Sequence, residues 1–353
     1  MSDKMKAVTV KPGNQIALED APKPQLERAH EAIVKVTTAA ICGSDLHVKD
    51  GLVPGTEPGN LIGHEFVGVV TEVGASVTRF KPGDRVTAPP AYWCGICPAC
   101  RRGDLSYCAN GGIYGCGSIL SKGYQGAQAE YVRTAYADNC LTMVPDSIDD
   151  EQAVIVPDVF QTGYHAAYEG HIDVGDTVVI FGCGPIGMGA LISAQLFGPK
   201  KVLSVDMRDK RLAVAKQYGA VPIDARKENV EQRIRELTDG EGADVAIEAV
   251  GVPQAFLQAL GSVRRNGAVS VVGAFSEPVA LPLQNYCNKG NGVRLSIGLG
   301  YIGRTSKLLG LVESHGVDLK PFVTHVFPLD KAMEAYELFE NHPDDCIKVL
   351  LKP

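Results

Sequence analysis

The fold of one half of this chain is decided by the stretch Thr177-Val-Val-Ile-Phe-Gly-Cys-Gly-Pro-Ile-Gly187. A short apolar run typical of a buried strand, Thr177–Phe181, leads directly into the spacing Gly-x-Gly-x-x-Gly. A helical stretch follows over Ile186–Phe197. A glycine turn between a strand and a helix brings backbone N–H groups and the positive end of the helix to one point, where a pyrophosphate binds. The stretch therefore predicts a dinucleotide-binding turn.

Strands and helices alternate on the C-terminal side of this turn. A second strand is expected at Val202–Val205 and a second helix at Lys210–Tyr218. Further strands are expected at Val245–Ala249, Ala268–Val272 and Val293–Ile297. Alternation of this kind is typical of a parallel sheet with right-handed crossovers. The pattern predicts an α/β domain with a doubly wound parallel sheet.

Each glycine of the motif has an expected role. Gly182 allows the tight turn, Gly184 lets the backbone approach the pyrophosphate, and Gly187 lets helix and strand pack closely. The second strand ends in Asp206, nineteen residues after Gly187. A carboxylate there accepts hydrogen bonds from the ribose hydroxyls and repels a 2′-phosphate, so NAD is favoured over NADP. The cofactor-binding residues expected here are Gly182, Gly184, Pro185, Ile186, Gly187 and Asp206.

Composition excludes several other classes of protein. A length of 353 residues is enough for about two domains. The net charge is -7, from 34 Lys and Arg against 41 Asp and Glu, and no basic run stands out, so nucleic acid is disfavoured as a partner. No apolar stretch approaches the ~20 residues that span a bilayer, and the N-terminus has no signal-peptide pattern. We expect no membrane partner and a cytoplasmic location.

The regions that flank the parallel sheet have a different character. The first ~155 residues read as β-rich, with short strand-like runs such as Ala32–Val36 and Phe66–Val73 broken by Gly and Pro. The last ~50 residues, ending at Ile347–Leu351, return to a mixed pattern. The pattern leaves two alternatives open: the C-terminal segment rejoins the first region, or it forms a third small lobe.

Four of the ten cysteines lie in one short segment. The spacing is Cys94-x-x-Cys97-x-x-Cys100-x7-Cys108. Four thiolates on a compact loop suit a tetrahedral zinc ion, and a site closed by four protein ligands leaves no position for chemistry. The segment therefore predicts a structural zinc. A redox-active Cys-x-x-Cys pair and an iron–sulfur cluster are the alternatives.

A second group of metal-ligating side chains is dispersed along the chain. It comprises the segments Cys42-Gly-Ser-Asp-Leu-His47, Gly63-His-Glu65 and Asp158-Val-Phe-Gln-Thr-Gly-Tyr-His165. A catalytic zinc takes three protein ligands and keeps a fourth position for water or substrate. Spacing alone does not select the ligands from these segments.

Together these motifs resemble the zinc-containing medium-chain alcohol dehydrogenases over essentially the whole chain. The resemblance implies a GroES-like β-rich catalytic domain over residues 1–156, with a structural-zinc lobe at 93–110. It further implies a Rossmann NAD-binding domain over 157–299 and a C-terminal return to the catalytic domain over 300–353. It also implies a homo-oligomer, a tetramer rather than a dimer.

The resemblance assigns roles to individual residues. It implies one catalytic zinc on Cys42, His64 and Asp158, and one structural zinc on Cys94, Cys97, Cys100 and Cys108. Glu65 resembles the carboxylate that can replace water on the metal, and Asp45 the group that orients His64. Ser44 and His47 would relay the alcohol proton to solvent. Thr162 would face the nicotinamide, Arg211 would lie near the adenosine ribose, and Lys348 near the pyrophosphate.

Two positions depart from the liver-type pattern. Asp158 stands where liver-type enzymes have Cys, which resembles the microbial secondary-alcohol dehydrogenases and the glutathione-independent formaldehyde dehydrogenases. Gly43 stands where those enzymes carry a basic residue for the pyrophosphate, so Lys348 is expected to supply that charge. Aromatic residues at Tyr92, Trp93 and around 299–301 are expected to line the substrate pocket.

The expected activity is reversible hydride transfer between a primary or secondary alcohol and NAD, giving an aldehyde or ketone. One alternative is a formaldehyde dehydrogenase or dismutase, although that group carries an insertion for which 353 residues leave little room. Another is a polyol dehydrogenase, although that group commonly has Glu where this chain has Asp158. A non-catalytic dinucleotide-binding protein is disfavoured, because such proteins lose the Cys and His ligands that this chain keeps.

Overall fold

The computed structural model describes residues 3–287, 292–298 and 302–353. The chain divides into two compact units, one made of Met1–Asp158 with Tyr301–Pro353 and the other of Val159–Gly300. The limits of these units lie next to the boundaries expected at 156/157 and 299/300. The C-terminal segment joins the N-terminal region through strand pairing, and so does not form a lobe of its own.

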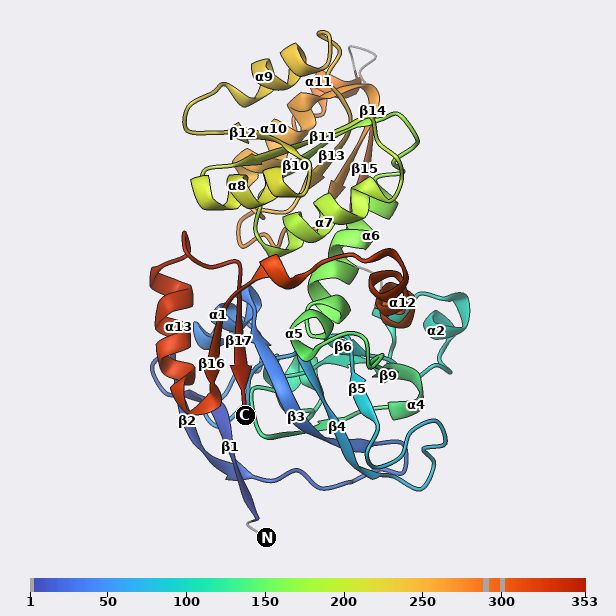
Figure 1. Ribbon diagram of the computed structural model, residues 1–353, viewed down its shortest axis with the longest axis vertical. Helices are drawn as coiled ribbons and strands as arrows, with labels where there is room; N and C mark the ends of the chain where they lie inside the picture. The colour runs from blue at the N-terminus through green and yellow to red at the C-terminus, as the bar shows by residue number, and fades with distance from the viewer. Residues whose placement is uncertain (1–2, 288–291, 299–301) are drawn as a thin grey trace. The chain divides into compact units, whose positions relative to one another are not determined.

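The first unit is built on a seven-stranded mixed sheet in the order β16-β17-β3-β4-β5-β9, with β8 also paired to β3. At its centre β3 (Ala32–Ile41) pairs antiparallel with β4 (Phe66–Val73), β8 (Tyr131–Thr134) and β17 (Lys348–Lys352). Figure 1 shows the last strand of the chain beside β3. This pairing brings side chains from both ends of the sequence to one place.

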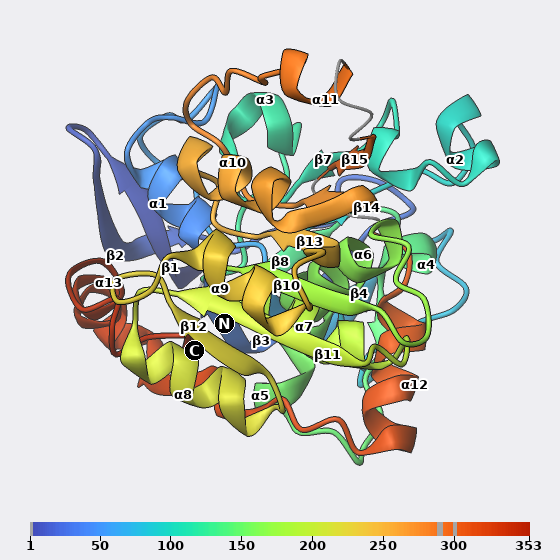
Figure 2. The ribbon, with the colours of Figure 1, turned by 90° about the horizontal axis from the view of Figure 1, so that it is seen from above.

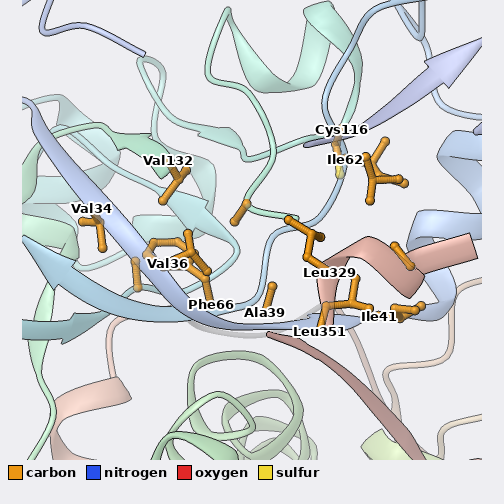
Figure 3. Close-up of a cluster of buried hydrophobic side chains, with 14 of the residues drawn as sticks. Val34, Val36, Ala39, Ile41, Ile62, Phe66, Cys116, Val132, Leu329 and Leu351 are labelled. Carbon is orange, nitrogen blue, oxygen red and sulfur yellow. The ribbon is translucent and has the colours of Figure 1, made fainter. Parts of the chain in front are cut away.

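Apolar residues of these strands form the main core of the first unit. Val34 and Val36 of β3 lie with Phe66 of β4 and Leu351 of β17 in one buried cluster (Figure 3). Cys116 belongs to the same cluster and is 6 % exposed. Such a cluster stabilises the sheet mainly through the apolar area that it removes from water.

Short elements surround this sheet. The strands are β1 (Lys4–Lys11), β2 (Gln15–Pro22), β5 (Arg85–Thr87), β6 (Ala91–Tyr92), β7 (Gly112–Ile113), β9 (Thr142–Met143) and β16 (Val323–Pro328). The α-helices are α1 (Gly43–Lys49), α2 (Pro98–Arg102), α3 (Gly117–Ser121), α4 (Ala137–Cys140), α5 (Asp150–Ala153), α12 (Thr305–His315) and α13 (Ala332–Asn341). The other turns of helix are η1 (Leu105–Tyr107), η2 (Val156–Phe160), which is a π-helix that runs into the second unit, η3 (Lys320–Phe322) and η4 (Leu329–Lys331).

The second unit is a parallel six-stranded sheet in the order β12-β11-β10-β13-β14-β15. Its strands are β10 (Thr177–Phe181), β11 (Lys201–Asp206), β12 (Val221–Asp224), β13 (Ala243–Glu248), β14 (Val263–Val271) and β15 (Val293–Ile297). Its helices are α6 (Gln161–Glu169), α7 (Pro185–Gln195), α8 (Asp209–Gln217), α9 (Val230–Leu237), α10 (Pro253–Ser262) and α11 (Gln284–Cys287). The predicted fold class is confirmed.

Right-handed crossovers decide which face of this sheet each helix covers. From β10 the chain adds β11 and β12 toward one edge of the sheet, and it then crosses back to add β13 and β14 toward the other edge. Since the crossovers are right-handed, α7 and α8 cover one face of the sheet and α9 and α10 cover the opposite face (Figures 1 and 2). The strand order reverses at β10. The carboxyl end of β10 is therefore the topological switch point, where ligands of such sheets bind.

The sequence analysis found most strands of this sheet but omitted β12. Val221–Asp224 is only four residues long, contains Pro222 and lies at the edge of the sheet. Proline is tolerated at an edge, where a missing N–H donor costs no ladder bond, but it hides the strand from a pattern of β-branched residues. In the described part of the chain, no helix is long and apolar enough to cross a membrane.

Candidate active site

Four cysteines converge in a loop of the first unit. Cys97 precedes α2 and Cys100 lies within it, while Cys94 and Cys108 flank it. The Sγ–Sγ separations are 3.5 Å for Cys97 and Cys100, 3.8 Å for Cys97 and Cys108, and 3.5 Å for Cys94 and Cys108. Four sulfurs at ~2.3 Å from a tetrahedral zinc lie about 3.8 Å apart. The loop therefore has the spacing of a four-thiolate zinc site.

A second cluster gathers ligands from three separate segments. Cys42 lies between β3 and α1, His64 just precedes β4, and Asp158 lies in the π-helix η2. Together with Glu65, these residues bring one ligand atom each to within 4.8 Å of one another. A π-helical turn widens the backbone spacing, and such turns occur often at functional sites. The sheet and this turn thus assemble a group that is dispersed in the sequence.

The electrostatics of this cluster centre on His64, which is 4 % exposed. Its Nε2 lies 3.5 Å from Asp158 Oδ2 and its Nδ1 lies 3.5 Å from Asp45 Oδ1. Burial opposes a charged imidazole, but Asp158 and then Asp45 raise the pKa of His64 well above its usual range. Burial likewise opposes ionisation of Asp158, yet His64 lowers the pKa of that carboxyl to about 2. The anionic groups thus make the cluster attractive to a cation.

Glu65 faces Lys348 inside the same cluster. Lys348 Nζ contacts Glu65 Oε2, and the two side chains are 1 % and 0 % exposed. Burial disfavours the ammonium group, but Glu65 and Cys42 raise the pKa of Lys348 above its usual range. Burial also raises the pKa of the Glu65 carboxyl well above its usual range, while Lys348 opposes this rise. The resemblance had placed Lys348 near the cofactor pyrophosphate. The structure gives it Glu65 as a partner, and the contact with the pyrophosphate stays a prediction.

The chemistry of the donors fits a zinc ion. Thiolate, imidazole and carboxylate are the side chains that bind zinc in proteins, and nitrogen and oxygen ligands at ~2.0–2.1 Å in a tetrahedron lie about 3.4 Å apart. The separation of His64 Nε2 from Asp158 Oδ2 agrees with this value. Burial raises the pKa of the Cys42 thiol, but Lys348 and then His64 lower it to a net value below its usual range, which favours a thiolate ligand. Among the described residues, Asp45 Oδ1 and His64 Nδ1 are buried without a hydrogen bond.

Two further residues expected at the site lie on α1. Ser44 Oγ is 3.4 Å from His64 Nε2, and both Ser44 and His47 are partly exposed. Residues three apart lie on the same face of a helix. The structure therefore places the hydroxyl beside the ligand cluster and the imidazole on the same side of α1, as a proton relay requires.

The glycine turn of the second unit follows β10. Gly182 has a φ of 93°, and a Cβ on Gly187 would lie 1.8 Å from Gly182 O, so neither position accepts a side chain without strain. Asp206, at the end of β11, accepts hydrogen bonds from Cys183 N at 2.7 Å and from Met207 N at 2.7 Å. Its carboxylate therefore holds the turn, and its contact with the ribose stays a prediction.

The remaining residues that were expected to contact the cofactor or the substrate lie in different surroundings. Arg211 Nη1 would lie 3.5 Å from a Cβ built on Gly184, so its guanidinium is beside the turn. Thr162 lies in α6 and is partly exposed. Tyr92 is 1 % exposed within a cluster of tyrosines and donates to Ser121 O at 2.8 Å, so it does not line an open pocket. Residues 299–301 lie outside the described part of the chain.

Comparisons with known proteins match most of the chain. The description "Alcohol dehydrogenase GroES-like domain" matches residues 28–146, and "Zinc-binding dehydrogenase" matches 185–314. An alcohol dehydrogenase of Cupriavidus necator is 36 % identical over 98 % of both chains. The solved alcohol dehydrogenase TADH of Thermus sp. ATN1 is 36 % identical over 99 % of both chains, with a TM-score of 0.93. A zinc-binding dehydrogenase of Sinorhizobium meliloti 1021, solved with NADP, is 25 % identical with a TM-score of 0.86 and covers all of both chains.

The fold and the clusters define a dehydrogenase of the medium-chain class. Within that class, the chain belongs to the zinc-type alcohol dehydrogenases and is an oxidoreductase. The predicted family is thereby confirmed.

Proposed function

We propose that this protein is an NAD-dependent alcohol dehydrogenase that interconverts primary or secondary alcohols with aldehydes or ketones. The observation that carries the proposal is the convergence of Cys42, His64 and Asp158 beside Glu65, within 4.8 Å. Three of these residues would be ligands of a catalytic zinc, which leaves the fourth position for the substrate. The four cysteines at 94–108 would hold a second, structural zinc.

The residues around the cluster support the proton transfer. Zinc, when bound, supplies Lewis-acid chemistry that lowers the pKa of an alcohol. Ser44 Oγ is beside the ligand group and would receive the alcohol proton, and His47, partly exposed on α1, would pass it to solvent. Glu65 and Lys348 would keep a neutral ion pair beside the ligands, so that the negative carboxylate does not occupy the substrate position.

NAD is proposed as the cofactor because Asp206 ends β11 next to the glycine turn. A carboxylate accepts two ribose hydroxyls but repels a 2′-phosphate. The Sinorhizobium meliloti relative holds NADP, so the choice within this chain rests on Asp206. We therefore expect Asp206→Gly to reduce the preference for NAD by about tenfold or more, because the repulsion is lost (~1.4 kcal/mol per tenfold change).

The assembly is proposed to be a homotetramer in the cytoplasm. β15 is an edge strand of the second unit and exposes 38 % of Leu295 and 70 % of Ile297, which supports pairing with another copy. In the first unit, the cysteine loop exposes 69 % of Ile96 and 78 % of Tyr107, which supports a second contact. The described cysteines form no disulfide, as expected for a reducing compartment.

The test is a set of assays with the purified, zinc-loaded protein. NAD⁺ or NADP⁺ is mixed with primary, secondary, cyclic and polyhydric alcohols, and formation of the reduced cofactor is followed by its absorbance. We expect turnover of primary or secondary alcohols with NAD⁺ and much slower turnover with NADP⁺. Activity with polyols alone, or with formaldehyde alone, would contradict the proposed substrate class.

A further inference from the structure

A chain of buried hydrogen bonds leads from the candidate metal cluster to the C-terminal helix α13. Its members are Asp45, Gln128 and Tyr336, which are 1 %, 0 % and 4 % exposed. Gln128 and Tyr336 had no role in the sequence analysis. Neither contributes a ligand atom, so their effect on the site has to pass through Asp45.

The side-chain amide of Gln128 has one possible orientation. One end of the amide lies 3.1 Å from Ala40 O and 2.9 Å from Asp45 Oδ2, and both of these groups only accept hydrogen bonds. That end must therefore be the NH₂ group. The amide oxygen then accepts from the hydroxyl of Tyr336 at 2.7 Å. The hydrogen bonds thus run in one direction, from Tyr336 to Gln128 to Asp45.

The carboxylate of Asp45 is in turn fixed at one oxygen. Oδ2 accepts from Gln128 Nε2 and from Cys42 N at 2.8 Å. Oδ1 is left facing His64 Nδ1 at 3.5 Å. A carboxylate held in this way favours the imidazole tautomer with its proton on Nδ1, which leaves the lone pair of Nε2 for a metal ion.

The backbone just before His64 pairs with the backbone of Gln128 and leaves room for its side chain. Gln128 N donates to Ile62 O at 3.0 Å, and Ala127 N donates to Gly63 O at 2.9 Å. Gly63, directly before His64, has a φ of 93°, and a Cβ there would lie 2.5 Å from Gln128 Cγ. The glycine therefore makes room for the Gln128 side chain beside the ligand.

We propose that Gln128 and Tyr336 are positioning residues of the catalytic zinc site, which hold Asp45 so that His64 presents Nε2 to the metal. The proposal rests on the zinc site put forward above. On this proposal the C-terminal segment contributes to the site, because Tyr336 of α13 is the first donor of the hydrogen-bond chain.

The test measures how fast zinc leaves the protein when a chelating indicator is added, for the wild-type full chain and five variants. The wild type should release two ions in two kinetic phases, and Cys42→Ala, which lacks one thiolate ligand, identifies the phase that belongs to the structural ion. Removing a direct partner of a metal-ligating His weakens metal binding by about 10–100-fold. Gln128→Leu should therefore speed the catalytic-site phase by about tenfold, and Tyr336→Phe, one bond further away, by about threefold.

Tyr124→Phe is the matched control. The Tyr124 hydroxyl is also buried and donates to a carboxylate, Glu31 Oε1, at 2.7 Å, but this pair is not part of the hydrogen-bond chain to the metal cluster. It should lower the melting temperature as Tyr336→Phe does, without changing zinc release from the catalytic site. The double variant of Gln128 and Tyr336 should release zinc no faster than Gln128→Leu alone, because both act through Asp45.

Each outcome decides between the possibilities. If zinc left the catalytic site at the same rate in Tyr336→Phe and Tyr124→Phe, while the wild type held two zinc ions, the positioning role would be overturned and the proposed zinc site would stand. The positioning role would also be overturned if the rate increases of the two single variants multiplied in the double variant, because the two residues would then act separately. A wild-type protein that binds only the structural ion would overturn the proposed zinc site and this inference together.

Discussion

The first unit holds two clusters of metal-ligating side chains, and the chain assembles them in opposite ways. One cluster takes all four ligands from a single loop, Cys94 to Cys108. The other takes Cys42, His64 and Asp158 from segments that only the folded sheet and the turn η2 bring together. The loop therefore brings its cysteines together locally, whereas the dispersed side chains depend on the sheet and on η2 for their placement.

The surroundings of the two clusters differ as much as their assembly. Four thiolates satisfy a tetrahedral ion and leave no position for a substrate. The dispersed cluster has three kinds of ligand, a buried ion pair of Glu65 and Lys348, and a hydroxyl from Ser44 beside it. Chemistry requires an open position and groups that move protons, so of the two clusters found among the described residues the dispersed one fits the proposed active site.

Loss of a ligand from the dispersed cluster should have the largest effect on turnover. Cys42→Ala removes a thiolate and with it the Lewis acid, whose stabilisation of developing charge is worth several kcal/mol, so turnover should fall by about a thousandfold or more. The zinc content should drop from two ions to one, with NAD binding largely kept. Cys140→Ala is the control, since Cys140 is a buried thiol outside both clusters. Near wild-type turnover of Cys42→Ala would show that the ligand set is wrong.

Ser44→Ala should have the next largest effect. The hydroxyl is the first group of the proposed relay, and general acid–base groups contribute about 10²–10⁴-fold to rate, so turnover should fall within that range. Zinc content should stay at two ions, because the three proposed ligands of the catalytic ion are Cys42, His64 and Asp158 and not Ser44. Measuring zinc and turnover on the same sample separates this variant from Cys42→Ala. An unchanged rate would remove Ser44 from the relay.

The two clusters could be predicted from the sequence to different extents, because one takes its side chains from a single loop and the other from separate segments. The cysteine spacing at 94–108 is local, so the residues alone predict a structural zinc, with an iron–sulfur cluster and a redox-active pair as the alternatives. The parallel sheet is also visible, because its strands other than β12 contain short apolar runs such as Thr177–Phe181. The dispersed ligands could be selected only through a family resemblance, since spacing does not reveal that β3, β4 and η2 meet.

The contacts of those ligands with residues far away in the sequence could not be predicted. Lys348 lies 283 positions after Glu65, and Tyr336 lies 208 positions after Gln128. Such pairs exist only because β17 joins β3 and α13 packs with the first unit. A buried lysine or glutamine reads in the sequence as an ordinary surface residue, so burial is the missing information.

Lys348→Met should have a smaller effect on turnover and a clear effect on stability. Removing one partner of a buried ion pair leaves the other charge unpaired and costs about 3–5 kcal/mol. The loss should be measurable by denaturant unfolding of the zinc-free protein and smaller in the zinc-loaded protein, where the metal offers Glu65 a cation. Turnover should fall by about tenfold, equal to about 1.4 kcal/mol, because a released Glu65 competes for the substrate position. Equal stability losses with and without zinc would contradict the link between the ion pair and the metal.

The smallest effect on turnover is expected for loss of a ligand from the four-cysteine cluster at 94–108. This variant tests most directly whether the two clusters have separate functions. Cys100→Ser should lower the zinc content to one ion, as Cys42→Ala does, because Ser is a poor zinc ligand. The loop should then lose its shape and become sensitive to proteolysis within 94–108, since binding of a structural zinc is worth about 10–16 kcal/mol in small domains. Turnover per folded molecule should nevertheless stay close to that of the wild type, because the proposed ligands Cys42, His64 and Asp158 and the proposed relay residue Ser44 all lie outside this loop. A loss of turnover as large as that of Cys42→Ala, in protein that is still folded, would show that the two clusters are not separate in function.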